Sequence, residues 1–225
     1  MKLLKRIVLI ALAVILAILL ASSVILGNLL FQLNRKSQAL ETDVQSLAQI
    51  YTQPLSAGPG EPITQQVSCG YAVIQMVSQW AGSPVTEAEL EQAYKKVVTS
   101  SADGFCREMN KQVPAYETRQ LTWLTDFQLL EAVCQSLEAG IPVPIQWAAQ
   151  YEGQWTLHYS LVTGADLQND RITVLNPYGL TETLTRQEFL DRTSFRAYEP
   201  MPLWLKLAFA LDVFQKNTLF PMTLK

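Results

Sequence analysis

The chain has few of the residues that usually bind metal ions. Its 225 residues include one histidine, His158, and three cysteines, Cys69, Cys106 and Cys134, which form no Cys-x-x-Cys pair. Structural zinc sites need several Cys and His ligands at short, regular spacing. The sequence therefore argues against a zinc site, and we expect no cofactor.

The odd number of cysteines leaves at least one thiol unpaired. If Cys106 and Cys134 form a disulfide bond, Cys69 is the free thiol. Alternatively, Cys106 and Cys134 are small buried apolar residues and all three thiols are free. The sequence leaves both possibilities open.

Acidic residues are absent from the first 36 positions. All 20 acidic residues and 12 of the 17 basic residues follow Lys36, so this part of the chain carries a net charge of −8. Negative charge repels nucleic acid phosphates and anionic lipid surfaces. We therefore expect no nucleic acid partner and no broad electrostatic attachment to anionic membranes.

Charge of either sign is absent from Ile7 to Gly27. About 20 apolar residues match the length of a helix that crosses the hydrocarbon core of a membrane. The apolar stretch of a secretory signal peptide is shorter, although Ala21-Ser22-Ser23 has the small residues of a cleavage site. We predict an uncleaved membrane anchor over residues 1–32, with cleavage as the alternative.

Positive charge predicts the orientation of this helix, because basic flanking residues tend to stay in the cytoplasm. Three basic residues precede the apolar run and two follow it, namely Lys2, Lys5 and Arg6, then Arg35 and Lys36. We therefore expect a single-pass membrane protein whose remaining residues lie on the extracytoplasmic side.

Composition divides the rest of the chain into three parts. Residues 33–62 are predicted to form a juxtamembrane stalk or linker, since the Gly- and Pro-rich residues 57–62 break any regular element. Residues 63–200 are long enough for one domain. The apolar tail, residues 201–225, is predicted to form a helix that packs on the domain or lies on the membrane surface. The oligomeric state is left open.

Within the domain, helical patterns come before strand patterns. Apolar residues recur at helical spacing in the first half and alternate or cluster in the second, whereas residues 99–120 show no period and are predicted to form a long loop. This order predicts an α+β fold in which helices pack on an antiparallel sheet. The expected helices start at Cys69 and at the capping residues Thr86, Asp126 and Thr185, of which Thr86 and Thr185 form capping boxes with Glu89 and Glu188. The expected strands cover residues 143–147, 157–164 and 171–175.

Cys69 lies at the start of a predicted helix and is the candidate nucleophile. A thiol attacks carbonyl groups as a thiolate, and its pKa falls at a helix N-terminus and beside an imidazole. Gly70 would let a substrate carbonyl approach the backbone, where the N–H of Cys69 can stabilise an oxyanion. The side chain of Gln65 or Gln66 is expected to supply a second donor.

His158 is the one residue available as the base. If strands 157–164 and 171–175 form a hairpin, His158 falls opposite Pro177 and beside Asn176. The amide oxygen of Asn176 is then expected to accept the Nδ1–H of the imidazole and to hold the ring in one tautomer.

The order of these segments resembles the C39-like cysteine peptidases, relatives of the bacteriocin-processing double-glycine peptidases in the papain-like superfamily. The resemblance extends from about Gln65 to Arg192 and rests on residues 65–72, 140–143, 158–164 and 174–179. It implies a papain-like fold, hydrolysis of peptide bonds in a peptide or protein substrate, and a catalytic triad of Cys69, His158 and Asn176.

Two positions differ from the family pattern. The oxyanion glutamine of the family lies further upstream, where this chain has Ile63, and the third triad residue is often aspartate instead of Asn176. The displaced glutamine favours an alternative, a papain-like module that binds peptides without cleaving them. A further alternative is an acyl-transferring enzyme in which an amine resolves the thioester of Cys69.

Overall fold

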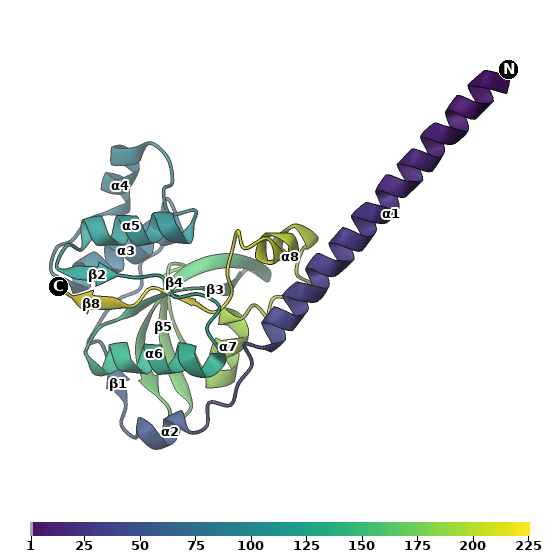
Figure 1. Cartoon of the computed structure of the whole chain (residues 1–225). Helices are drawn as coiled ribbons and strands as arrows, with labels where there is room; N and C mark the ends of the chain where they lie inside the picture. Colours follow the sequence, from purple (N-terminus) through teal and green to yellow (C-terminus); the bar gives the residue numbers. More distant parts are fainter. Residues whose placement is uncertain (1) are drawn as a thin grey trace.

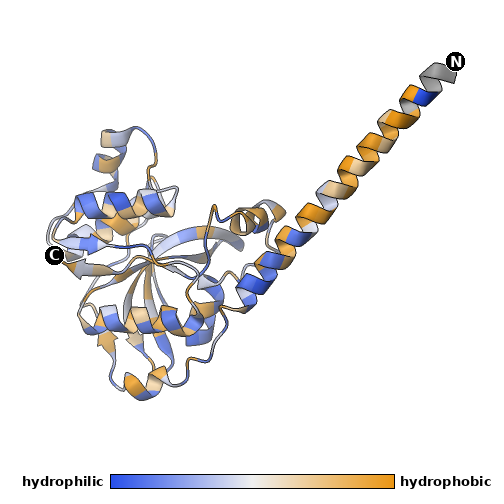
Figure 2. Cartoon of the chain, viewed as in Figure 1, coloured by the Kyte–Doolittle hydropathy of each residue, from blue (hydrophilic) through white to orange (hydrophobic). Residues whose placement is uncertain are grey.

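The computed structural model describes residues 2–225, which form a globular domain and one long helix that projects from it (Figure 1). Helix α1 (Lys2–Gln38) has a mean hydropathy of 3.0 in its most apolar window, and none of that window is buried. The helix is apolar along most of its length and becomes hydrophilic close to the domain (Figure 2). Its length and composition are sufficient to cross a membrane, although a signal sequence has the same properties.

The domain is built on an antiparallel sheet of six strands, with the order β6-β5-β4-β3-β7 and with β1 also paired to β4. A second sheet joins β2 and β8. The strands are β1 (Leu55–Ser56), β2 (Tyr116–Thr118), β3 (Val143–Tyr151), β4 (Gln154–Asp166), β5 (Arg171–Asn176), β6 (Leu180–Leu184), β7 (Thr218–Leu219) and β8 (Met222–Leu224). The predicted α+β class with an antiparallel sheet is confirmed.

Helices cover both faces of the large sheet. Adjacent residues of β4 belong to different cores, because successive side chains of a strand point to opposite faces. Leu161 packs in the core that contains α3 and α5, and Val162 packs in the core that contains α6 and α7. The helices are α2 (Leu47–Ile50), α3 (Cys69–Trp80), α4 (Glu87–Tyr94), α5 (Ala102–Gln112), α6 (Asp126–Glu138), α7 (Arg186–Thr193) and α8 (Leu203–Ala210).

Side-chain caps define where several helices begin. Thr86 and Thr185 form the predicted capping boxes with Glu89 and Glu188 at the starts of α4 and α7. The predicted cap of α6 was wrong by one residue, since Thr125 is the N-cap and Asp126 is the first helical residue.

The prediction of a long loop over residues 99–120 was wrong. Helix α5 and strand β2 lie in this segment, and Ser101 caps the helix by accepting the N–H of Gly104. Phe105 and Met109 are fully buried one helical turn apart. Polar residues surround these two positions, so their spacing was too weak to reveal a helix.

Both segments that flank the predicted domain contribute to it. In residues 33–62, Leu47 is fully buried and Leu55 pairs with Ala165 of β4. In residues 201–225, Leu219 pairs with Ile145 of β3, so the chain beyond α8 returns to the sheet. The stretch that we expected to be a stalk is therefore packed on the domain over much of its length.

Candidate active site

Cys69 is the first residue of α3, as its sequence position predicted. The N-cap is Ser68, whose hydroxyl accepts the N–H of Tyr71 at 3.2 Å. The side chain of Cys69 is partly buried. The thiol therefore lies at a capped helix N-terminus.

Glu87 holds the loop that leads into this helix. The Glu87 side chain is buried, and its carboxylate accepts three backbone N–H groups at 3.0 Å, from Gln66, Val67 and Ser68. Its own N–H donates to Oε1 of Gln75 on α3 at 2.9 Å. Sequence analysis missed this residue, which it treated only as part of a helix start.

The environment of Cys69 favours the protonated thiol. Burial raises the pKa of Cys69, whereas the backbone N–H groups of Tyr159 and Gly70 lower it by a smaller amount. The charge of Glu87 adds to the upward shift of the pKa. Tyr159 directly follows His158, so the backbone beside the candidate base lies next to the sulfur.

His158 and Asn176 are both buried and are hydrogen-bonded to each other. The Nε2 atom of His158 lies 2.9 Å from Oδ1 of Asn176. Oδ1 of Asn176 also accepts the N–H of Tyr178 at 3.1 Å, and Nδ2 donates to Oε1 of Glu182 at 2.6 Å. These two neighbours fix the orientation of the amide, because a backbone N–H needs an acceptor and a carboxylate needs a donor.

The orientation of the amide determines the tautomer of His158. An amide oxygen can only accept, so Nε2 of the imidazole must carry the hydrogen. Nδ1 is then unprotonated and able to take a proton. Our expectation that Nδ1–H would face Asn176 was wrong in its choice of nitrogen.

The strand register also differs from our prediction. Leu161 pairs with Leu175, one residue away from the predicted register, and a bulge follows between Val162 and Gly164. The ring of Tyr178 consequently stacks on the ring of His158, with centroids 4.3 Å apart.

Burial lowers the pKa of His158 to about 4, whereas Asn176 and Glu182 raise this pKa by smaller amounts. The imidazole is therefore neutral at pH 7.

A charged pair extends the network behind Asn176. Glu182 of β6 accepts from Nη1 of Arg192 at 2.6 Å, and the guanidinium of Arg192 lies 5.1 Å from the ring centroid of Trp147. Sequence analysis missed Glu182 and Arg192. A single carboxylate on an edge strand and a single arginine on a short helix form no sequence pattern that would indicate a role in the site.

The structure separates the two candidate oxyanion glutamines. The N–H of Gln65 donates to the carbonyl of Pro177 at 2.7 Å, which places Gln65 beside the turn that follows Asn176. The side chain of Gln66 is exposed and donates back to the carbonyl of Thr64 at 3.1 Å. The geometry therefore favours Gln65, whose buried Oε1 has no hydrogen-bond partner within residues 2–225.

Gly70 has a packing role that differs from our prediction. A Cβ atom at this position would lie 2.4 Å from Oγ1 of Thr99. Gly70 is buried against Thr99, so the neighbouring side chain requires the glycine. The glycine at position 70 is therefore explained by packing, without the close approach of a substrate.

Residues 41–203 match the model of the Peptidase_C39 like family. The chain belongs to this family. The resemblance predicted from the sequence is confirmed, and the domain is a cysteine peptidase-like module.

The family member is similar in structure to a double glycine motif protease from an AMS/PCAT transporter, solved in complex with the leader peptide. The match has a TM-score of 0.47 and 14% sequence identity, and it covers 77% of this chain and 99% of the other. A comparison with curated proteins found no match.

The remaining cysteines of this C39-like protein are not joined to each other. Cys106 is free, and its Sγ donates to the carbonyl of Thr118 at 3.1 Å. Cys134 is free and buried, and burial raises its pKa to about 12. Within the described part of the chain, no group of three or more His, Cys, Asp or Glu residues is arranged to hold a metal ion.

Proposed function

We propose that this protein is a membrane-anchored cysteine peptidase in which Cys69 is the nucleophile, His158 the base and Asn176 the residue that orients the base. The hydrogen bond between Asn176 and His158 is the observation that carries the proposal. It leaves Nδ1 of the imidazole as a proton acceptor. The backbone that follows His158 contributes an N–H to the environment of the Cys69 sulfur.

The reaction would begin with both groups neutral. As the sulfur of Cys69 forms a bond to the scissile carbonyl carbon, the thiol proton moves to Nδ1 of His158. The carbonyl π electrons move to the oxygen, which the N–H of Cys69 and the side-chain amide of Gln65 would stabilise. The C–N bond then breaks, and the imidazolium gives its proton to the leaving amine. Water, activated by His158, hydrolyses the thioester and restores the thiol.

Glu182 would support the charged state of His158. Asn176 is neutral and stabilises an imidazolium less than an aspartate would. The carboxylate of Glu182 lies one hydrogen bond further away and favours a positive charge on the ring. Nη1 of Arg192 pairs with this carboxylate at 2.6 Å.

Helix α1 would hold the peptidase at a membrane. The apolar length of α1 and the basic residues before it support a single-pass anchor with the domain on the extracytoplasmic side. Peptides or protein segments close to that surface are the proposed substrates.

A peptide-binding module without turnover is the second candidate. The raised pKa of Cys69 and the lowered pKa of His158 favour it, because both disfavour a thiolate–imidazolium pair in the free protein. The same site would then hold a peptide without cleaving it.

Digestion of a peptide library by the full chain in detergent tests the proposal, with cleavage products identified by mass spectrometry. We expect cleavage by the wild type and by a Cys106→Ser control, and no cleavage after Cys69→Ser or His158→Ala. A wild type that binds library peptides without cleaving them would select the second candidate. Cleavage that survives Cys69→Ser would rule out both.

A further inference from the structure

A cavity of about 410 Å³ lies where α1 meets the domain. Its wall includes Leu33 and Ser37 of α1, Arg196 from the segment after α7, Lys206 of α8, and Lys216 from the segment before β7. It is distinct from the candidate active site, because neither Cys69 nor His158 lines it.

Lys216 is an unusual component of this wall. The residue is only 7% exposed, and no hydrogen bond contributes to the pKa of its ammonium group, on which the carboxylate of Glu199 acts only through its charge. The ammonium lies 5.5 Å from the ring centroid of Phe209. Burial, followed by the charges of Arg196 and Lys206, lowers the pKa of Lys216 to about 8. A buried cation without a partner is costly and suggests a missing anion.

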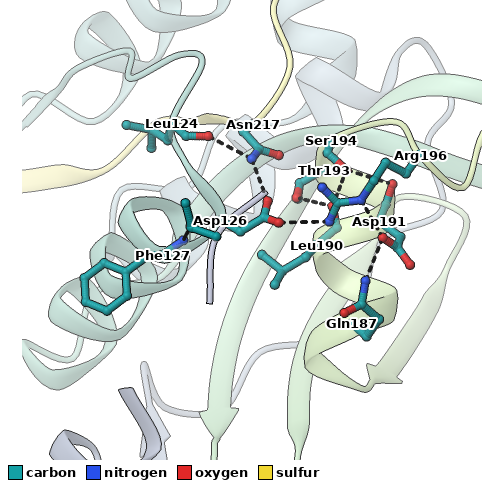
Figure 3. A network of polar contacts seen from close by, with 11 residues as sticks. Leu124, Asp126, Phe127, Gln187, Leu190, Asp191, Thr193, Ser194, Arg196 and Asn217 are labelled. Atoms are coloured by element: carbon teal, nitrogen blue, oxygen red, sulfur yellow. Dashed lines mark hydrogen bonds and ion pairs between the residues drawn. The ribbon is translucent and has the colours of Figure 1, made fainter. Parts of the chain in front are cut away.

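Two further polar groups of the wall are incompletely satisfied. The guanidinium of Arg196 is held by Asp126 at 3.0 Å and Asp191 at 2.7 Å (Figure 3), yet its Nη1 atom is buried without a partner in the described chain. Oγ of Ser37 is also buried without a partner there. Both groups lie beneath the wall of the cavity, which also contains Lys206 and Lys216.

The cavity lies near the level at which α1 would leave a membrane. The apolar run of α1 ends at Gly27, where Asn28 follows, and Leu30, about one helical turn further on, lines the cavity. Helix α8 lies beside this part of α1 (Figure 1), and Leu33 shares an apolar core with Leu205 and Phe209.

Apolar side chains of α8 and of the turn after it are exposed beside the cavity. Leu203 is 52% exposed and Trp204 is 61% exposed, and Leu211 and Val213 are exposed to a similar extent. An amphipathic tryptophan next to a membrane helix is typical of the membrane–water interface. These residues would therefore contact lipid when α1 spans a bilayer.

We propose that this cavity binds the phosphodiester group of a membrane phospholipid while α8 rests in the membrane interface. The inference depends on the membrane anchoring proposed above. Lys206 and Lys216 would donate to the phosphate oxygens, and the guanidinium of Arg196 would add positive charge. Glu41 and Glu199 also line the cavity, so it suits a headgroup with a single phosphate and disfavours a polyanion.

Native mass spectrometry of the full chain in detergent tests this site. The probes are dioleoyl phosphatidylglycerol and phosphatidylethanolamine, with dioleoylglycerol as the lipid that lacks phosphate. We expect one phospholipid per wild-type chain, no retained dioleoylglycerol, and at least a tenfold loss of phospholipid in the double variant Lys206→Gln/Lys216→Met. Lys96→Gln, an exposed lysine on the far part of the domain, should retain lipid like the wild type.

Three outcomes would overturn the inference: equal retention by the double variant, retention of dioleoylglycerol, or replacement of the lipid by inorganic phosphate at the same site. Lys216→Met preserves side-chain length and removes an unpaired charge, so thermal unfolding of the variant should match the wild type. Alkaline extraction of membranes tests anchoring separately. If the protein stays in the membrane after alkaline extraction but retains no phospholipid in native mass spectrometry, the lipid site alone is refuted. If alkaline extraction releases the protein from the membrane, the proposed anchor is refuted.

Discussion

Asn176 and His158 are joined through Oδ1 and Nε2 at 2.9 Å, and this contact assigns the proton of the imidazole. The assignment follows from two other contacts of the amide, with the N–H of Tyr178 and the carboxylate of Glu182. Asn176 therefore orients the ring of His158, and Tyr178 and Glu182 orient Asn176. The arrangement suggests how each part of the site can be tested.

Replacing Asn176 by alanine should lower kcat/KM by roughly 10²-fold, because the ring loses the acceptor that selects its tautomer. Asn176→Asp should retain more activity, since a carboxylate still accepts Nε2–H. The added negative charge should raise the pKa of His158 and move the acidic limb of the pH–rate profile upward. Steady-state assays across pH measure both effects. Wild-type activity in Asn176→Ala would show that the ring needs no orienting residue.

The buried imidazole of His158 should make folding sensitive to acid. Its pKa in the folded protein is about 4, below the value of 6.5 expected when unfolded, so the unfolded chain binds the extra proton between these values. Stability should fall as the pH decreases from 6.5 to 4, by about 3 kcal/mol at 1.36 kcal/mol per unit. Urea unfolding in detergent, followed by tryptophan fluorescence, measures the change.

His158→Gln provides the control for this pH dependence. The variant lacks the titrating ring, so its free energy of unfolding should vary less over the same pH interval. An equal slope in both proteins would assign the acid sensitivity to carboxylates elsewhere in the domain.

Glu87→Gln should loosen the loop before Cys69 and destabilise the domain by about 1–3 kcal/mol, because the three backbone N–H groups lose their charged acceptor. Loss of the negative charge should also lower the pKa of Cys69. Thermal unfolding and the pH dependence of Cys69 alkylation measure these effects. Glu91→Gln, an exposed carboxylate on the same helix, should change neither quantity.

Gly70→Ala should destabilise the domain by about 1–3 kcal/mol, since its Cβ would overlap the side chain of Thr99. The double variant Gly70→Ala/Thr99→Gly should recover part of the loss, as measured by thermal unfolding. Gly27→Ala should not destabilise the protein, because no atom lies within 4 Å of its added Cβ and alanine favours a helix. Failure of the double variant to recover any stability would place the strain elsewhere.

Local signals made much of the site predictable. Cys69 was identified because it precedes a helical pattern, and His158 because the chain has no other histidine. Asn176 followed from pairing two adjacent strands through a short connection, which tolerates an error of one residue. Each of these signals depends on neighbours in the sequence.

Other features depended on contacts between distant segments. Glu87 meets residues about twenty positions earlier, and Lys216 becomes unusual only when Arg196 and Lys206 fold around it. The choice between Nδ1 and Nε2 depended on the contacts of Asn176 with His158, Tyr178 and Glu182. No local pattern encodes such contacts, because burial and partner geometry arise when the whole chain is packed.

The sequence by itself determined an apolar membrane-length helix, an α+β order of elements, and one thiol and one imidazole suited to hydrolysis. Only the tertiary structure decided which ring nitrogen of His158 faces Asn176, which glutamine lies beside the turn after Asn176, and which lysine is buried. Periodicity and composition act over a few residues, whereas protonation and charge pairing depend on the three-dimensional surroundings of each group.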